Sequence, residues 1–512
     1  MGLENYEQQE VRFGYLRNNQ DTLYLKENES SDTFNFELFK DTQIGTLARR
    51  PDVTKLVYSG SVDAAPSANP VLGFFHSPSF DGTKYFAYAI NGKVYYHNGT
   101  ASPDEIKTGL GSSNIVRFAR FVDDKVYIVN LNDAMFVWDP ASDATTTSVA
   151  SGSPPNSQLI EEHKSHLFLG MISGAEGTIR YCEFEDAAVW TVTNDFQFND
   201  KINGMISHAN ILVAFTASKT HLIEGDNSNN FGVSTLDDGS GCIAPFSVVT
   251  AQGSVFFCSH NGFKVISSLN PPVLISGDVQ SSFNLLRDTS LENIQGTYDY
   301  IKEEVVWGCN LTGTDNDIAT VTLFNAFFIY ELKTGKFKIR LVKDGFGRTL
   351  GQYINSNGAI TSAFGNDVGR INFFDAFTGS DFIDHSTTAT QDLKYVTAPL
   401  DQGDRRRIKK YNKFRLFVKP ASGDTLTIKF KTDRLAQVSK VIKLDRTPYR
   451  DHGQAFLDAL EYVPVDVDLL TEGTYIMFEI TNAADSTADI NLMHGVLFYT
   501  FEGIESNLEE TT

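Results

Sequence analysis

The sequence predicts an all-β fold, a six- or seven-bladed β-propeller followed by a C-terminal antiparallel β-sandwich. Three observations predict it. The chain of 512 residues contains 39 Phe and 20 Tyr, residue types that favour strands. Its 39 Gly, together with many Asn, Asp, Ser and Thr, supply turns between short apolar runs. These runs recur with a period in the forties and about four strands per period, which is typical of propeller blades.

The strands of the expected propeller read as successive hairpins from about residue 70 onward. Residues 84–100 hold two apolar runs that flank Asn91-Gly92, a dipeptide that strongly favours a two-residue hairpin turn. Residues 115–140 repeat the pattern around Asp123-Asp124. Further hairpins are expected at 163–184, 204–225, 241–266 (with Asn261-Gly262 as its turn), 294–337 and 358–379.

The repeat is also visible in matching positions. Phe118, Leu167, Ile211 and Val255 are separated by 49, 44 and 44 residues. Three units end on an aromatic strand that is followed by an acidic residue and small turn residues, in "VWDPASD" (137–143), "IYELKTG" (329–335) and "FFDAFTG" (373–379). The pattern indicates six or seven units, and a stacked β-sandwich is the alternative interpretation of the same strands.

Changes in composition divide the chain into four parts. We expect an N-terminal extended segment over 1–44, the propeller over 45–395, the sandwich over 396–505 and a frayed tail over 506–512. The start of the chain has no apolar stretch of the kind found in signal peptides. No window approaches 18 uninterrupted apolar residues, so we expect a soluble protein that is made in a cytoplasm and does not insert into a membrane.

Charge is distributed unevenly. The net charge of −21 argues against a general nucleic-acid-binding protein. Residues 405–450 carry 15 Lys and Arg against 3 Asp, a net charge of +12, whereas residues 451–512 carry 13 Asp and Glu and no Lys or Arg, a net charge of −13.

Basic and acidic strands that lie side by side would neutralise each other within one domain. Alternatively, the basic strip contacts a neighbouring copy in a homo-oligomeric ring. A third interpretation, that this strip grips nucleic acid, lacks support from residues 1–404, whose net charge is −20 (−21 − 12 + 13). The contact residues predicted for the ring are Arg405, Arg406, Arg407, Lys409, Lys410 and Lys413.

Catalytic patterns are sparse, so the sequence predicts a protein that is not an enzyme, with no catalytic residue, metal or cofactor. It contains no H-E-x-x-H, G-x-S-x-G or P-loop pattern, and "GFGRTLG" (345–351) has the spacing of a turn rather than of a dinucleotide loop. His163 and His166 fit surface or hairpin positions better than a zinc site. The four cysteines are widely spaced and are expected to be buried small hydrophobic residues: Cys182, Cys242, Cys258 and Cys309.

The carboxylate clusters are candidate catalytic residues, because propellers include glycosidases, which use two carboxylates at a defined separation. The candidates are Glu161-Glu162, the group Glu183, Glu185 and Asp186, and Asp237-Asp238. Nothing in their spacing indicates that they converge, and a chain with 64 acidic residues contains such pairs by chance. An enzyme would therefore rest on fold analogy alone.

Three stretches together resemble the propeller-bearing tail hub or nozzle proteins of tailed bacteriophages. In "FNFELFKDTQIGTLARRPDVTKL" (34–56), Arg49, Arg50 and Pro51 form the corner before the first blade. In residues 159–199, a His-containing hairpin leads to a strand that ends in an acid and Trp, with Glu183, Asp186 and Trp190 as the matching residues. The third stretch is "GCIAPFSVVTAQGSVFFCSHNGFKVI" (241–266). The chain departs from the pattern at His166 and Asp52.

The resemblance implies a structural protein of the virion tail. Such a protein forms part of a ring, as a tail hub, nozzle or head-to-tail connector, around the channel through which DNA is ejected. Its partners would be other copies and other tail or connector proteins, and DNA would pass without specific binding, because an acidic lumen repels phosphates. The alternative functions are a glycan-binding or glycan-cleaving propeller for host recognition and a scaffold propeller on the host side.

Overall fold

The computed structural model describes most of the chain, which divides into two compact units. Unit 1 comprises residues 1–51, 336–340 and 390–512, and unit 2 comprises residues 52–335 and 341–389. The prediction of an all-β fold is confirmed, because the elements are almost all strands. The described residues are 7–11, 16–17, 25, 30–34, 36–38, 47–49, 54–56, 68–78, 84–97, 104–140, 147–148, 152–313, 318–342, 346–354, 360–374, 385–387, 394–418, 425–443, 463–482 and 491–501.

The first four sheets of unit 2 are four-stranded antiparallel meanders, in which each strand pairs with the next along the chain. Short connections allow only neighbouring strands to pair, which is why the local hairpin pattern is so regular. The strands are β6 (Val71–Pro78), β7 (Lys84–Ile90), β8 (Lys93–His97) and β9 (Asp104–Lys107); β10 (Arg117–Arg120), β11 (Val126–Val129), β12 (Phe136–Trp138) and β13 (Thr147–Ser148); β14 (Ser157–His163), β15 (His166–Ile172), β16 (Thr178–Tyr181) and β17 (Asp195–Gln197); and β18 (Ile202–His208), β19 (Ile211–Thr216), β20 (Thr220–Glu224) and β21 (Gly232–Asp237).

The remaining sheets of unit 2 continue the pattern, with short helical turns η3 (Ser276–Val279), α1 (Gln280–Phe283) and η4 (Asp288–Asn293) between two of them. The last sheet takes strand β5 from the N-terminal side of the chain, between β32 and β33. The strands are β22 (Val249–Ala251), β23 (Ser254–Ser259), β24 (Gly262–Ser267) and β25 (Val273–Leu274); β26 (Gln295–Asp299), β27 (Glu304–Cys309) and β28 (Ala326–Glu331); and β30 (Gly347–Ile354), β31 (Ile360–Asn366), β32 (Ile371–Phe373), β5 (Thr54–Leu56) and β33 (His385–Thr387).

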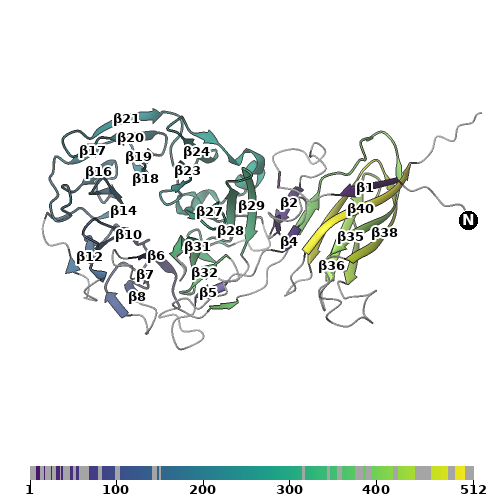
Figure 1. Cartoon of the computed structure of the whole chain (residues 1–512), viewed down its shortest axis with the longest axis horizontal. Helices are drawn as coiled ribbons and strands as arrows, with labels where there is room; N and C mark the ends of the chain where they lie inside the picture. Colours follow the sequence, from purple (N-terminus) through teal and green to yellow (C-terminus); the bar gives the residue numbers. More distant parts are fainter. Residues whose placement is uncertain are drawn as a thin grey trace, which may run out of the picture. The chain divides into compact units, whose positions relative to one another are not determined.

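The sheets of unit 2 stand radially around a common centre (Figure 1). Their first strands contact one another in the order β6, β10, β14, β18, β22, β26 and β30, and β30 contacts β6, so the cycle is closed. This radial arrangement of four-stranded sheets is that of a β-propeller. Apolar side chains fill the space between successive sheets, with Trp138 and Trp307 among the largest fully buried residues.

Glycines on the inner strands permit these strands to converge. A Cβ on Gly73 would lie 2.1 Å from the Val116 carbonyl oxygen, and a Cβ on Gly351 would lie 2.8 Å from the Phe74 ring. Real side-chain carbons do not approach other atoms so closely. Glycine inside a strand therefore marks close approach of neighbouring sheets at this position.

The hairpin turns match the sequence prediction at Asn91-Gly92 and differ at Asn261-Gly262. Asn91 and Gly92 have φ of 52° and 71°, the left-handed values that a type I′ turn requires. At the second site Ser259 pairs with Gly262, so His260 and Asn261 form the turn. Gly262 begins β24, where a Cβ would lie 2.2 Å from the Ser276 hydroxyl oxygen. The predicted turn was wrong by one residue because this contact, not the turn, selects glycine.

One of the four repeat positions is out of register. Leu167, Ile211 and Val255 lie on the second strands β15, β19 and β23, as a true repeat requires. Phe118 lies on the first strand β10, so the spacing of 49 residues does not join equivalent sites. A period-2 apolar pattern is nearly the same on both strands of a hairpin, and this explains the error.

Unit 1 contains two sheets with a common hydrophobic core. The first has the order β3-β4-β40-β35-β38, with β1 also paired to β40, and the second contains β2-β34-β39-β36-β37, with β29 parallel to β2. Phe414 and Phe478, one from each sheet, stack with ring centroids 4.2 Å apart. The strands are β1 (Glu7–Val11), β2 (Ser30–Phe34), β3 (Phe36–Leu38), β4 (Leu47–Arg49), β29 (Lys336–Leu341), β34 (Lys394–Thr397), β35 (Lys409–Val418), β36 (Thr425–Thr432), β37 (Val438–Lys443), β38 (Val463–Gly473), β39 (Ile476–Asn482) and β40 (Asn491–Phe501).

The N-terminal region belongs to these sheets, which differs from the expectation of a separate segment over 1–44. β1 pairs with β40 from Glu7–Tyr499 to Val11–Gly495, and β2 pairs with β34. A lone strand leaves its main-chain polar groups unpaired, so it pairs with strands built by distant residues. Arg49 lies in β4, whereas Arg50, Pro51 and the tail 506–512 lie outside the described residues.

Candidate functional site

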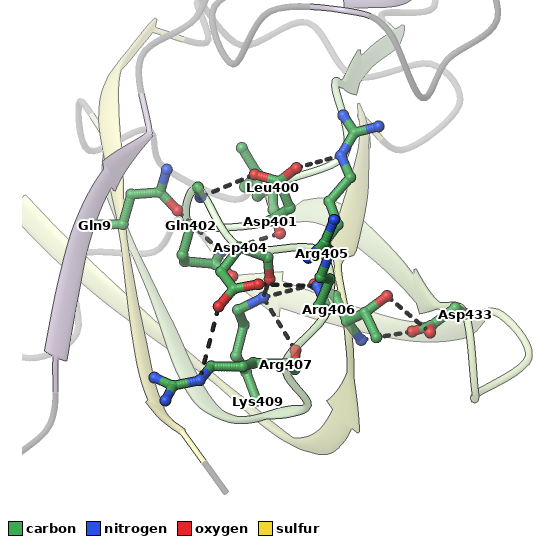
Figure 2. A network of polar contacts seen from close by, with 12 residues as sticks. Gln9, Leu400, Asp401, Gln402, Asp404, Arg405, Arg406, Arg407, Lys409 and Asp433 are labelled. Carbon is green, nitrogen blue, oxygen red and sulfur yellow. Dashed lines mark hydrogen bonds and ion pairs between the residues drawn. The ribbon is translucent and has the colours of Figure 1, made fainter.

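The residues predicted as an inter-subunit contact lie in the turn before β35 and on β35 itself. Figure 2 shows the polar network of this turn. Arg405 forms an ion pair with Asp401, and the Nε atom of Arg407 lies 3.7 Å from the Asp404 carboxylate. The main-chain N–H of Arg406 donates to Asp404 at 3.0 Å, and its side chain is exposed. The turn is therefore held by short-range acid–base pairs.

Lys409 is buried, with its ammonium at the centre of this network (Figure 2). The ammonium donates to the main-chain carbonyls of Asp404, Arg407 (3.2 Å) and Thr474 (2.9 Å). Asp433 holds the Thr474 loop by accepting from its N–H and hydroxyl at 2.8 and 2.9 Å. Burial lowers the pKa of Lys409. Its ammonium therefore stabilises the turn from inside and is not available for contact with another subunit.

Basic β35 pairs with the acidic strand β38 on one side and, on the other, with β40, which contains no Asp or Glu. Lys413 and Arg415 both contact Asp466 on β38, at 3.0 and 2.7 Å. On the second sheet, Lys429 of β36 pairs with Glu479 of β39 at 2.6 Å. This geometry is that of local neutralisation, the first interpretation of the charge pattern. The exposed remainder of the predicted contact is Arg405, Arg406, Arg407 and Lys410.

The predicted carboxylate clusters do not converge on one site. Glu183 accepts from Thr191 and Asn194 at 2.7 and 2.9 Å, and Asp186 accepts from the N–H of Ala188, so both stabilise the connection between β16 and β17. Asp238 pairs with Lys219 on the surface. These contacts are local and structural, so they give no pair of carboxylates positioned for glycoside hydrolysis.

His163 and His166 flank a tight hairpin turn, but they are buried rather than at the surface. Lys164 and Ser165 between them both have positive φ. His163 Nδ1 lies 2.9 Å from the Ser207 hydroxyl on β18, and burial lowers the pKa of His163 to about 4. A neutral imidazole therefore links two neighbouring sheets.

Unit 2 contains a cavity of about 320 Å³ between the first strands of its sheets, which we call the axial cavity. The inner strands of six sheets line it, among them β10, β26 and β30. Its walls combine aromatic rings with hydroxyl and amide groups. Sequence reasoning did not find this site, because its residues are spread over the whole repeat. The residues used below are Arg117, Phe118, Thr250, Tyr298, Tyr300 and Gln352.

Two half-buried charges lie near this cavity. Arg117 is on β10, with its guanidinium carbon 5.0 Å from the centre of the Phe246 ring. Glu161 on β14 accepts a hydrogen bond from the N–H of Ser207 at 3.0 Å. Burial raises the pKa of Glu161 to about 7, against the opposing effects of that hydrogen bond and of Arg117. The one sequence signal for this site is an arginine inside the apolar strand "NIVRFARFV" (114–122).

Glu161 should make the stability of unit 2 depend on pH. Its pKa is raised in the folded state, so the folded protein holds the proton more tightly than the unfolded chain does. Stability therefore falls as pH rises from about 4.5 to about 7, and is level above that. Glu161→Gln should remove this loss, and unfolding followed by tryptophan fluorescence should show the variant gaining about 1–2 kcal/mol relative to wild type between pH about 4.5 and about 8. If the variant and the wild type differ in free energy of unfolding by the same amount at pH about 4.5 and about 8, Glu161 is not the source of the pH dependence.

The four cysteines are buried and unpaired, which confirms the prediction of small buried hydrophobic residues. Burial raises the pKa of each thiol above its usual range. Within the described residues, no group of three or more His, Cys, Asp or Glu side chains could hold a metal ion. The same part of the chain contains no helix that is long and apolar enough to cross a membrane.

Comparison with known proteins gives fold-level similarity only. No protein-family model and no curated protein matches the chain. Similar solved structures include the WD40 β-propeller domain of Doa1 (12% identity, 62% of this chain and 96% of that chain, TM-score 0.40). Others are YCF48 bound to D1 peptide (11%, 66% and 98%, TM-score 0.41) and BBS1N in complex with ARL6DN (9%, 64% and 100%, TM-score 0.42). At these identities and TM-scores the similarities carry no argument about function.

Proposed function

We propose that this protein is a structural component of a tailed-bacteriophage virion, built from a seven-bladed β-propeller and a β-sandwich. It forms part of a homo-oligomeric ring, in a tail hub, nozzle or head-to-tail connector, around the channel for DNA. It acts with other tail or connector proteins and has no catalytic role. The observation that carries the proposal is that two of the three stretches resembling such proteins, 159–199 and 241–266, are packing junctions of the fold.

The stretch "GCIAPFS" (241–247) is the clearest of these junctions. Cys242 N–H donates to the carbonyl of Thr216 at the end of β19. The Ser247 hydroxyl accepts from the N–H of Cys258 on β23 at 3.0 Å, and the Ser247 carbonyl accepts from the Trp307 indole on β27 at 2.9 Å. A Cβ on Gly241 would lie 2.3 Å from the Thr216 carbonyl oxygen. Three sheets are joined here, so the motif specifies a shape and supports a structural role.

The stretch 159–199 has the same character. Glu183 and Asp186 form an isolated bridge, and Trp190 is buried with its indole N–H donating to the Ala187 carbonyl at 2.8 Å. The matching residues therefore build one connection between strands. Such residues support a shared architecture and a structural role.

A glycan-binding propeller is the second candidate, and the axial cavity is the observation that favours it. Tyr298 and Tyr300 line that cavity, and their ring centroids are 4.4 Å apart. Aromatic rings beside hydroxyl and amide groups suit sugar binding. No Asp or Glu is among the described residues that line the cavity, so binding is favoured over cleavage.

Native mass spectrometry at two salt concentrations tests the ring. We expect a discrete ring of the 56.8 kDa chain, weakened by salt, that the triple variant Arg405→Glu, Arg406→Glu, Arg407→Glu abolishes without unfolding the protein. The matched control is Lys431→Glu, Arg434→Glu, Lys440→Glu, which reverses three other exposed charges of unit 1. A monomer under both conditions would contradict the ring, and a glycan array would then test the second candidate. If the triple variant still forms rings, the charges of the basic turn are neutralised within their own unit and do not hold the copies together.

A further inference from the structure

Arg117 is an unusual residue for an inner strand. Its neighbours in sequence, Val116 and Phe118, are buried or half-buried and pack between the first two sheets. Because side chains alternate across a strand, Arg117 lies on the other side of β10, with Ile115 and Ala119. Residues from both faces of β10 line the axial cavity, Arg117 and Phe118 among them. A half-buried cation in this place loses hydration, and burial lowers the pKa of Arg117.

The described part of the protein offers the guanidinium of Arg117 no hydrogen-bond acceptor and no ion pair within 4.0 Å. Its guanidinium contacts the face of the Phe246 ring. Glu161 attracts it at longer range, but the Glu161 carboxylate accepts its hydrogen bond from the N–H of Ser207. Five N–H donors in a planar fork match the two oxygens of a carboxylate.

The rest of the cavity has a different chemistry. Phe75 and Phe118 stack at a centroid distance of 5.9 Å, and Tyr298 and Tyr300 form a second aromatic pair. Thr250 and Gln352 add hydroxyl and amide groups. Arg117 is the one formally charged side chain among the described residues that line the cavity. Tyr300 is 51% exposed, so the cavity reaches the surface beside it.

We propose that the axial cavity binds a small molecule that carries one carboxylate on a ring-shaped body, with Arg117 binding the carboxylate. The volume of about 320 Å³ suits a ligand of this size. The aromatic walls bind the face of the ring, whether that ring is aromatic or a sugar. The site goes beyond the proposed virion function, which assigns no ligand to the propeller.

Saturation-transfer NMR on the full chain, with benzoate and glucuronate as probes, tests the site. Benzyl alcohol and glucose are the uncharged counterparts. We expect saturable binding of at least one acid with a Kd of about 1 mM or below, and weaker binding of its uncharged counterpart. Preference for glucuronate identifies an acidic sugar as the ligand class, and preference for benzoate identifies an aromatic acid.

Variants distinguish the site from non-specific binding. Arg117→Gln should weaken binding of the acid by about 10- to 100-fold, and Arg117→Lys by less, because the charge stays while the fork is lost. Arg180→Gln is the matched control, since Arg180 pairs with Asp195 on the same unit and does not line the cavity. Tyr300→Ala, at an exposed rim position, keeps the test valid if Arg117→Gln fails to fold. Absence of saturable binding of both acids, or equal binding by wild type and the folded Arg117 variants, would overturn the proposal. Failure of ring formation has no bearing on this result.

Discussion

Replacing Asp299 with Ala is expected to lower the free energy of unfolding of unit 2 by about 3–5 kcal/mol, the largest effect we predict. Asp299 ends β26 and is 1% exposed. One carboxylate oxygen accepts from the N–H groups of Ile301 and Lys302, both at 3.0 Å, and so closes the turn to β27. The other oxygen accepts from Thr361 and twice from Ser362, at 2.8–3.1 Å.

The size of the effect follows from the donors that Asp299→Ala would leave without an acceptor. They belong to two sheets, because Thr361 and Ser362 lie on β31 of the neighbouring sheet. Asp299→Asn should lose less stability, because the asparagine carbonyl oxygen can still accept from the turn N–H groups. Its amide nitrogen cannot accept from Ser362, so part of the stability is still lost. Leaving a buried donor without an acceptor costs more free energy than the hydrogen bond itself contributed to stability.

Tryptophan fluorescence during urea unfolding is the appropriate measurement. All three tryptophans, Trp138, Trp190 and Trp307, lie in unit 2 and are buried. Asp238→Ala is the matched control: Asp238 is exposed and, among the described residues, forms its ion pair with Lys219 at the surface, so its removal should leave stability almost unchanged. A loss for Asp299→Ala no larger than that of Asp238→Ala would refute the role of Asp299 as a tie between sheets.

The second large effect is expected in unit 1, where Lys409→Met should destabilise the fold by about 2–4 kcal/mol. Methionine preserves much of the volume of the lysine stem, so packing is retained. The carbonyls of Asp404, Arg407 and Thr474 would lose the ammonium that now satisfies all three. The turn before β35 would then open more readily.

Hydrogen exchange measured by mass spectrometry over β35 and β38 should reveal this opening as faster exchange. Lys413→Met is the control, because Lys413 is more exposed and shares Asp466 with Arg415, and its loss should have an effect below about 1 kcal/mol. Equal exchange in the two variants would show that the Lys409 ammonium contributes no more than a surface charge.

The basic strip illustrates why a charge pattern alone does not identify an interface. The net charges of 405–450 and 451–512 are a property of the sequence. Pairing of β35 with β38 brings basic and acidic residues together within one unit. Strand order, which depends on contacts some 50 residues apart, decides whether a basic strand faces a partner or its own chain.

Local features of this protein were determined by the sequence itself. The all-β class, the hairpin at Asn91-Gly92 and the burial of the four cysteines follow from residue type, alternation and turn geometry over a few residues. Tertiary structure decided the rest. The insertion of β5 into the last sheet, the addition of β1 to β40 and the convergence of inner strands around Arg117 all join segments that are far apart in the chain. Such pairings depend on which sheet edges are left unpaired and how closely backbones can approach, and neither is visible in a window of sequence.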